Sequence, residues 1–313
     1  MAKTLARAAL VAAFLSPTAA ALAGPPSVVA SFQPLQSLAA LVMQGVGTPE
    51  TIVTSTVSEH TYALKPSDAR KLKAADLVIL IGPEYESFLT KLLKDRKGET
   101  LAILDLPGLK RLPVRQGGVW EAHEHHEEHD DHDHETEDEH GADDGHVWLD
   151  PTNAAIAVQA IADRLARLDQ ANADLYQSNA QAARQRIDAL DKDLAAMLAT
   201  VKDRPFVVFH DAYQYLESRY GLAAAGSITI DPDRPPSAKR VAALRDRLKA
   251  ANAACVFREP QFPSPLVVSL AESTGAREGV LDPQGAAIPN GPDHYFTLMR
   301  QLGQSLLSCL TPR

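Results

Sequence analysis

Short apolar runs alternate with amphipathic segments through the first third of the chain. The run Leu77–Ile81 reads LVILI, and such a continuous apolar stretch is typical of a strand buried on both faces. Segments with helical spacing follow these runs, and this alternation favours a parallel α/β sheet. The predicted strands are Val28–Phe32, Thr51–Val57, Leu77–Ile81 and Leu101–Leu104, and the predicted helices are Leu35–Val46, Pro66–Ala75 and Glu84–Lys94.

The same alternation returns in the last third of the chain and predicts a second α/β unit. Its first strand, Phe206–Phe209, reads FVVF and is again continuous and apolar. The other predicted strands are Ala254–Phe257, Glu278–Leu281 and one within Ala223–Ile230, and the predicted helices are Tyr213–Tyr220, Ser237–Ala250, Pro265–Thr274 and His294–Cys309.

A long helical pattern separates the two units. Asp150 can cap a helix whose first residue is Pro151, and the pattern continues to Leu168. After a pause at 169–172 it resumes over Ala173–Thr200, a segment without Gly or Pro. A helix of this length would be roughly 42 Å long, which exceeds a small domain, so we expect it to bridge two domains.

The N-terminus has the features of an export signal. Lys3 and Arg7 precede the apolar run Ala8–Leu15, and Ala21-Leu22-Ala23 has the small-x-small pattern of a cleavage site. The run is too short to span a bilayer, and no cysteine follows the cleavage site to carry a lipid. We therefore expect a soluble protein that is exported to a bacterial periplasm, with the signal peptide cleaved near Ala23.

The net charge of −9 is local in origin. Residues 121–146 contain thirteen acidic residues and no Lys or Arg, so the rest of the chain carries +4, and nothing suggests nucleic-acid binding. The two cysteines, Cys255 and Cys309, could form one disulfide in an oxidising compartment, closing a loop of about 54 residues. The alternative is a pair of reduced, buried cysteines, and export favours the disulfide.

Residues 121–146 also contain eight of the eleven histidines. Imidazole suits zinc, copper and nickel, and carboxylates add charge and oxygen ligands, so the tract favours a metal collector over a merely solvated acidic loop. Almost no apolar residues are present to offset the chain entropy, so we predict that the loop 121–145 is disordered. The weak auxiliary ligands expected in it are His123, His125, His126, His129, His132, His134 and His140.

Three further positions suggest a more ordered metal site. His60 follows the predicted strand Thr51–Val57, and His210 directly follows Phe206–Phe209. Open α/β sheets bind ligands at the carboxyl ends of their strands. His146 closes the histidine-rich tract. Each histidine alone is more typical of a structural role, but their joint placement favours metal binding.

Several ordered motifs resemble a known family. They are SEHTYALKPSDA at 58–69, HVWLDP at 146–151 and FHDAY at 209–213, followed by EPQF at 259–262 and LDP at 281–283. Together they resemble the zinc-uptake periplasmic binding proteins of the ZnuA type, over nearly the whole mature chain.

The resemblance implies an α/β fold of two lobes with parallel-sheet architecture, joined by one long connecting helix, with the metal held between the lobes. The expected domains are a signal peptide (1–23), an N-terminal lobe (24–172), a linker helix (173–200) and a C-terminal lobe (201–313). The implied function is capture of Zn²⁺ in the periplasm and its delivery to an ABC permease in the inner membrane. We expect a monomer that is not an enzyme.

By the same resemblance, His60, His146 and His210 are the zinc ligands. Three imidazoles leave zinc one position short of a tetrahedron. Glu59 matches the acid that fills this position in zinc-specific relatives, while Asp282 matches an alternative ligand or a residue that supports one, and water would also serve. Cys255 and Cys309 resemble the disulfide pair of the family.

Other functions remain open at this point. A manganese-binding homologue is one, although three histidines favour zinc over manganese, which prefers oxygen ligands. A zinc hydrolase with a three-histidine site is another, but the chain contains neither HExxH nor GxSxG. A metal buffer or surface adhesin is a third. Of the remaining polar residues, Asp211 is expected to support a ligand histidine or a turn, and His294 to be exposed.

Overall fold

The computed structural model describes residues 24–54, 57–58, 60, 62–115, 143–229 and 236–312. The predicted signal peptide (1–23), most of the predicted loop (121–145) and all seven auxiliary histidines lie outside the described residues, as does Glu59.

The N-terminal lobe is built on a parallel sheet with the strand order β2-β1-β3-β4. β1 lies between β2 and β3, with Val29 opposite Glu50 on one side and Val78 on the other. The strands are β1 (Val28–Phe32), β2 (Glu50–Val53), β3 (Leu77–Leu80) and β4 (Glu99–Ala102), and the helices are α1 (Gln33–Val42), α2 (Pro66–Ala74) and α3 (Ser87–Lys94).

The C-terminal lobe repeats this arrangement with the order β6-β5-β7-β8, again all parallel. Its strands are β5 (Phe206–His210), β6 (Ala224–Thr229), β7 (Cys255–Arg258) and β8 (Arg277–Val280), and its helices are α6 (Gln214–Tyr220), α7 (Ala238–Ala250) and α8 (Pro265–Thr274). In each sheet the first strand lies between the second and the third, so the next two strands are added on opposite sides of it. Open α/β sheets form their ligand crevices at such a point, at the carboxyl ends of the strands.

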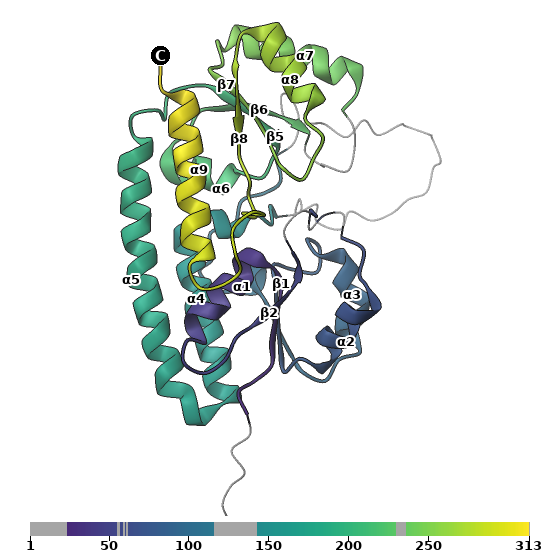
Figure 1. Ribbon diagram of the computed structural model, residues 1–313, viewed down its shortest axis with the longest axis vertical. Helices are drawn as coiled ribbons and strands as arrows, with labels where there is room; N and C mark the ends of the chain where they lie inside the picture. Colours follow the sequence, from purple (N-terminus) through teal and green to yellow (C-terminus); the bar gives the residue numbers. More distant parts are fainter. Residues whose placement is uncertain are drawn as a thin grey trace, which may run out of the picture.

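Three long helices connect the lobes along one side of the molecule (Figure 1). They are α4 (Pro151–Leu168), α5 (Ala173–Leu198) and α9 (His294–Leu310). Asp150 caps α4 as predicted, accepting a hydrogen bond from the backbone of Thr152 at 2.9 Å. The predicted linker helix is α5, which has 26 residues and runs beside both lobes.

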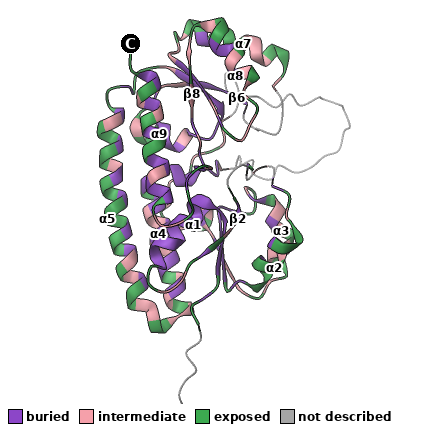
Figure 2. Cartoon of the chain, in the orientation of Figure 1, coloured by how far each residue is buried: buried purple, intermediate pink, exposed green. Residues whose placement is uncertain are grey.

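α5 buries one stripe and exposes the other, as the alternating colours in Figure 2 show. The buried residues of α5 recur every three or four positions, which keeps one face against α4 and α9. Gly303 of α9 permits close approach, because a β-carbon there would lie 2.8 Å from a methyl group of Leu194. The expected two-lobed α/β fold with a long connecting helix is therefore confirmed.

Most predicted elements are confirmed, with changes at their ends. Residues 103–105 and 147–149 form short 3₁₀ turns (η1 and η2), and a third, η3, spans Gln170–Asn172. The helix predicted from Glu84 begins only at Ser87. The reason is Glu86, whose buried carboxylate accepts hydrogen bonds from the backbones of Ile81 and Gly82 and so holds a turn open before the helix.

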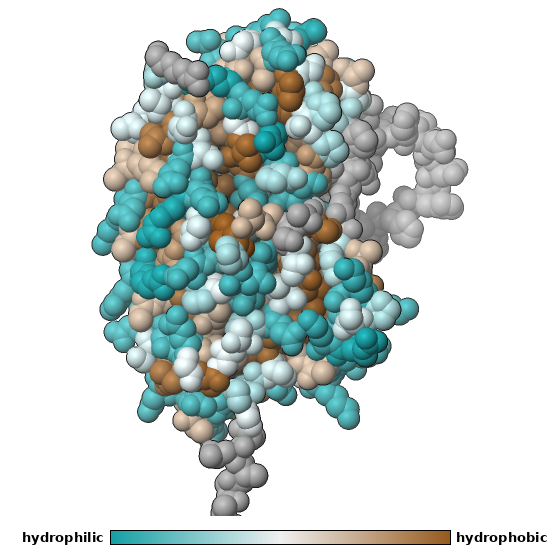
Figure 3. Space-filling model, in the orientation of Figure 1, coloured by the Kyte–Doolittle hydropathy of each residue, from teal (hydrophilic) through white to brown (hydrophobic). Residues whose placement is uncertain are grey.

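Cys255 and Cys309 form the expected disulfide, with their α-carbons 6.2 Å apart. The bond links β7 of the C-terminal lobe to the last turn of α9. The face seen in Figure 3 is mostly hydrophilic, with apolar residues in small groups. In the described part of the chain, every helix is too short or too polar to cross a membrane.

Candidate metal centre

The structure brings His60, His146 and His210 together. One ring nitrogen from each lies within 4.8 Å of the others, so that among the described residues these three side chains form a group that could hold a metal ion. His60 follows β2 and His146 precedes η2, both in the N-terminal lobe, whereas His210 is the last residue of β5 in the C-terminal lobe. An ion held by all three would therefore join the two lobes.

Two of the histidines face each other directly. The Nε2 atoms of His146 and His210 are 3.2 Å apart, and the two side chains are 7% and 2% exposed. His60 is half-buried, and its ring centre lies 5.6 Å from each of the other two. The centre is thus nearly closed to solvent but accessible on the side of His60.

Buried carboxylates hold the other nitrogens of this pair. The Nδ1 of His210 lies 2.7 and 2.8 Å from the two oxygens of Glu259, and the Nδ1 of His146 lies 2.7 Å from Asp144. A carboxylate accepts from Nδ1–H, and this leaves the lone pair of Nε2 available for a cation. The pair is therefore oriented for metal binding by acids that also make each imidazole more basic.

Neither acid was expected in this role from the sequence. Asp211, the neighbour of His210 in the chain, was expected to support a ligand histidine or a turn, but it instead pairs with Arg115. Glu259 is 49 residues from His210 in sequence and reaches it because β7 lies beside β5. The EPQF motif that contains Glu259 was the one available signal.

Asp144 is fixed by contacts from the opposite lobe. Its second oxygen accepts a hydrogen bond from Gln214 at 3.1 Å, and its backbone carbonyl accepts one from the hydroxyl of Tyr215 at 2.9 Å. Burial raises the pKa of Asp144 to about 6, although the backbone of His146 and the charge of Arg115 favour its ionised form. α6 thus positions a carboxylate that in turn positions His146.

Aromatic rings close one side of the centre. The ring of Tyr85 lies 4.9 Å from that of His60 and 5.4 Å from that of His146. Trp148 stacks at an angle 5.3 Å from His146, and its Nε1 donates a hydrogen bond to the carbonyl of Pro283 at 2.9 Å. These rings cover one side of the histidine pair, and Trp148 also ties the His146 segment to the loop after β8.

A hollow of about 220 Å³ opens beside the histidines and is lined by His60 and His146. Four of its other lining residues are acidic, namely Glu84, Asp143, Asp144 and Asp211. Arg115 lines the same hollow and pairs with Asp211, so the acids still outnumber the cation, and a net negative lining favours cations.

The remaining candidate residues lie elsewhere. Asp282 is outside the three-histidine group, and its carboxylate accepts hydrogen bonds from Gln261 and from three backbone N–H groups, of which Ala286 is the nearest at 2.7 Å. These hydrogen bonds show that Asp282 stabilises the loop 282–286. The expectation that His294 is exposed is wrong: it is buried beneath this loop, and its Nε2 lies 2.8 Å from the carbonyl of Gln284.

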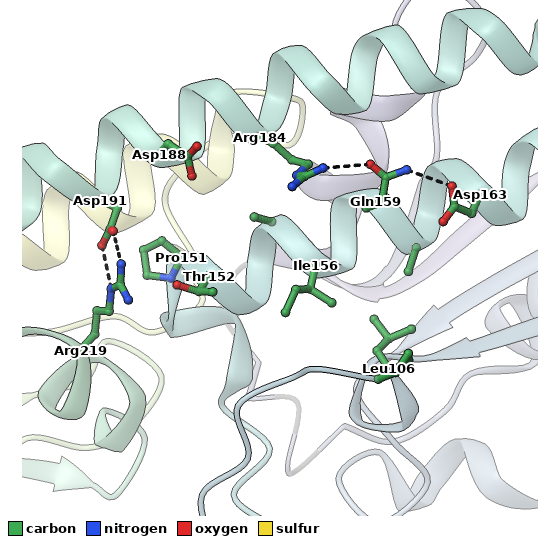
Figure 4. Close-up of a pocket in the computed structure, with 13 residues that line it drawn as sticks. Leu106, Pro151, Thr152, Ile156, Gln159, Asp163, Arg184, Asp188, Asp191 and Arg219 are labelled. Carbon is green, nitrogen blue, oxygen red and sulfur yellow. Dashed lines mark hydrogen bonds and ion pairs between the residues drawn. The ribbon is translucent and has the colours of Figure 1, made fainter.

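A second hollow, of about 440 Å³, lies between α4 and α5 and is lined by none of the three histidines (Figure 4). Arg219 of α6 and Asp191 of α5 pair at one end of it, and Arg184 and Gln159 are hydrogen-bonded at 3.3 Å at the other. Because its lining comes mainly from α4 and α5 and includes none of the three histidines, the hollow is a groove between connecting helices rather than part of the metal centre.

Known proteins share the sequence pattern and the fold of this chain. The family described as "Zinc-uptake complex component A periplasmic" (ZnuA) matches residues 28–309. The High-affinity zinc uptake system protein ZnuA of Brucella suis is 45% identical, with 91% of each chain covered. The protein of the same name from Yersinia pestis is 36% identical, again over 91% of each chain. A solved structure titled "Crystal structure of ZnuA" superimposes with a TM-score of 0.77 at 24% identity, covering 92% of this chain and all of the other.

Proposed function

Because the chain belongs to the ZnuA family of periplasmic zinc-uptake proteins, we propose that His60, His146 and His210 bind Zn²⁺ as cargo for an ABC permease of the inner membrane. Zinc uptake and the periplasmic location follow from the family. We further propose that the protein delivers the ion to the permease and that its signal peptide is cleaved near Ala23.

The observation that carries the proposal is the spacing of His146 and His210. With zinc–nitrogen bonds of about 2.0–2.1 Å, two nitrogens of a zinc tetrahedron lie about 3.3 Å apart. The two Nε2 atoms are 3.2 Å apart, and the carboxylates of Asp144 and Glu259 face the opposite ring nitrogens. The spacing of the histidine pair therefore suits a tetrahedral ion.

Glu59 or water would complete the tetrahedron. Glu59 is adjacent to His60 in the chain, and a carboxylate would add an anionic ligand to the three neutral imidazoles. The carboxylate of Asp282 is less suited to this position because its hydrogen bonds to the loop would have to break first. We therefore favour Glu59 over Asp282 as the fourth ligand.

Delivery requires that the site can open. His210 belongs to the proposed C-terminal lobe (201–313), and the other two ligands belong to the proposed N-terminal lobe (24–172), so a small rotation of the lobes separates the ligands. The linker helix (173–200) limits this motion because it packs along both lobes. The protein acts in this scheme as a monomeric carrier and not as a zinc hydrolase.

Titration calorimetry of metal-free protein tests the ligand assignment. His60→Ala and His210→Ala should lose tight zinc binding, because each leaves an incomplete ligand shell. His140→Ala, in the histidine-rich tract, is the matched control and should keep the tight constant. Wild-type affinity in both site variants would refute the assignment, and zinc-dependent hydrolysis of esters or peptides would refute the carrier role.

A further inference from the structure

Arg115 is the cationic side chain that lines the hollow beside the histidines. It comes from the N-terminal lobe, just after Pro113 forms an antiparallel bridge with Asp143. Its guanidinium faces two acids of the C-terminal lobe. Nε donates to Asp211 at 2.9 Å, Nη1 donates to Glu217 at 2.6 Å, and Nη2 donates to both.

This group is largely buried. The side chains of Arg115, Asp211 and Glu217 are 18%, 5% and 8% exposed. Burial alone would lower the pKa of Arg115, but its hydrogen bonds and the charges of both acids raise that pKa, so the side chain stays charged. A bidentate pair of this kind restricts the orientation of the carboxylate as well as neutralising it.

Asp211 has a position from which it could reach the metal. It directly follows His210 in the chain and lines the same hollow as His60 and His146. Yet it is outside the group of side chains whose ligand atoms lie close enough to share an ion. Both of its oxygens instead accept hydrogen bonds from Arg115.

We propose that Arg115 is a specificity-determining residue that favours zinc over manganese by holding the carboxylate of Asp211 away from the three-histidine centre. Nitrogen-rich sites suit zinc, whereas manganese prefers more oxygen ligands and a larger coordination number. If the Asp211 carboxylate could reach the ion, it would add oxygen ligands and so raise the coordination number. The inference rests on the proposed function, since it concerns the selectivity of the same site.

The Arg115→Met variant tests the proposal. Without the guanidinium, two buried acids lie together; one takes a proton, and the metal ion becomes the nearest positive charge for the other. Competition titration of metal-free protein with Mn²⁺ and Zn²⁺ should show the ratio of manganese to zinc affinity rising at least tenfold. The visible absorption of bound Co²⁺ should weaken, as expected when a four-coordinate ion gains a ligand.

Three matched variants separate selectivity from folding. Arg115→Met combined with Asp211→Asn should return the affinity ratio to that of the wild type, because no freed carboxylate remains. Arg219→Met breaks a similar bidentate pair, with Asp191 on α5, and should leave the ratio unchanged. Arg115→Lys keeps the positive charge but cannot make the bidentate hydrogen bonds of the guanidinium, so it should raise the affinity ratio less. It serves as the test variant if Arg115→Met does not fold.

The outcomes distinguish this inference from the proposed function. If the wild-type protein has no tight zinc site, or if His210→Ala binds zinc normally, the proposed function itself is wrong. If the wild-type protein binds zinc tightly but the affinity ratio is unchanged in Arg115→Met, only the role of Arg115 is wrong. A change that persists in the double variant would also overturn that role.

Discussion

The ring of Tyr85 lies against the backbone of Gly145, so closely that a β-carbon on residue 145 would fall 2.1 Å from Cδ2 of Tyr85. Gly145 precedes His146, and the Tyr85 ring also packs on His60 and His146. A residue without a side chain is therefore what lets an aromatic ring seal the metal centre.

Gly145→Ala should displace this ring. Overpacking of this kind costs about 1–3 kcal/mol of stability, and the shift of His146 should weaken zinc binding. Chemical denaturation and zinc titration measure the two effects. In a Tyr85→Ala background there is no ring to clash with, so adding Gly145→Ala should cost much less stability than it does in the wild type. If the single variant Gly145→Ala is as stable as wild type, the packing argument is wrong.

Glu259→Ala should weaken zinc binding by about 10- to 100-fold, because His210 loses the carboxylate that orients it. Glu259→Gln should have a smaller effect, since the amide oxygen still accepts from Nδ1–H. A competition assay with a metal chelator gives the constants. Asp282→Asn is the control: it should lower stability without changing zinc affinity. Loss of tight zinc binding in this control would make Asp282 the fourth ligand instead.

Glu217 should make stability depend on pH. Burial raises its pKa to about 7, although Arg115 lowers it, compared with 4.5 for an ordinary glutamate. Between these values the folded protein holds a proton that the unfolded chain has released. The associated stability is thus present below about pH 4.5 and is lost as the pH rises through 7.

Glu217→Gln removes this dependence. The unfolding free energies of the variant and of the wild type are measured by denaturation at pH 5 and at pH 7.5. Relative to the wild type, the variant should be more stable at pH 7.5 than at pH 5, by on the order of 2 kcal/mol. Glu272→Gln, at an exposed position on α8, should track the wild type. A difference between Glu217→Gln and wild type that is the same at both pH values would contradict the prediction.

Removing the disulfide should lower stability without affecting the metal. In the chain-entropy model a loop of 54 residues is worth about 4 kcal/mol. Cys255 lies opposite Phe206 at the start of β5, whereas His210 is at its end, so the bond and the metal centre are on opposite edges of the sheet. Denaturation and zinc titration of Cys255→Ser/Cys309→Ser check this; two free thiols in the wild-type protein purified from periplasm would show that the bond does not form there.

Deleting Glu121–His140 should leave the tight zinc site intact and remove several weaker ones. The deletion spares His146 and the buried Asp144 that orients it. Ligands in a tract of this composition must be ordered at the moment of binding, so each should bind more weakly than the preformed centre. Equilibrium titration should show the stoichiometry falling towards one. Collapse of the tight constant would mean that the tract is part of the main site.

Local patterns in the sequence were enough to predict most helices and strands and the likeness to the family. The apolar run of β3 predicts a buried strand, and the absence of Gly and Pro from 173–198 predicts the long helix, because these preferences depend on residues a few positions apart. His60, His146 and His210 could be named from the sequence because each lies in a short motif of contiguous residues.

The groups that surround those histidines depend instead on how the chain folds and packs. Sequence neighbourhood suggested Asp211 as the partner of His210, yet β7 brings Glu259 there, and Arg115 from the other lobe takes Asp211. Likewise His294 is buried because the loop after β8 folds over the start of α9. Such contacts depend on strand order and on how two lobes pack, and these are properties of the whole chain that no short segment specifies.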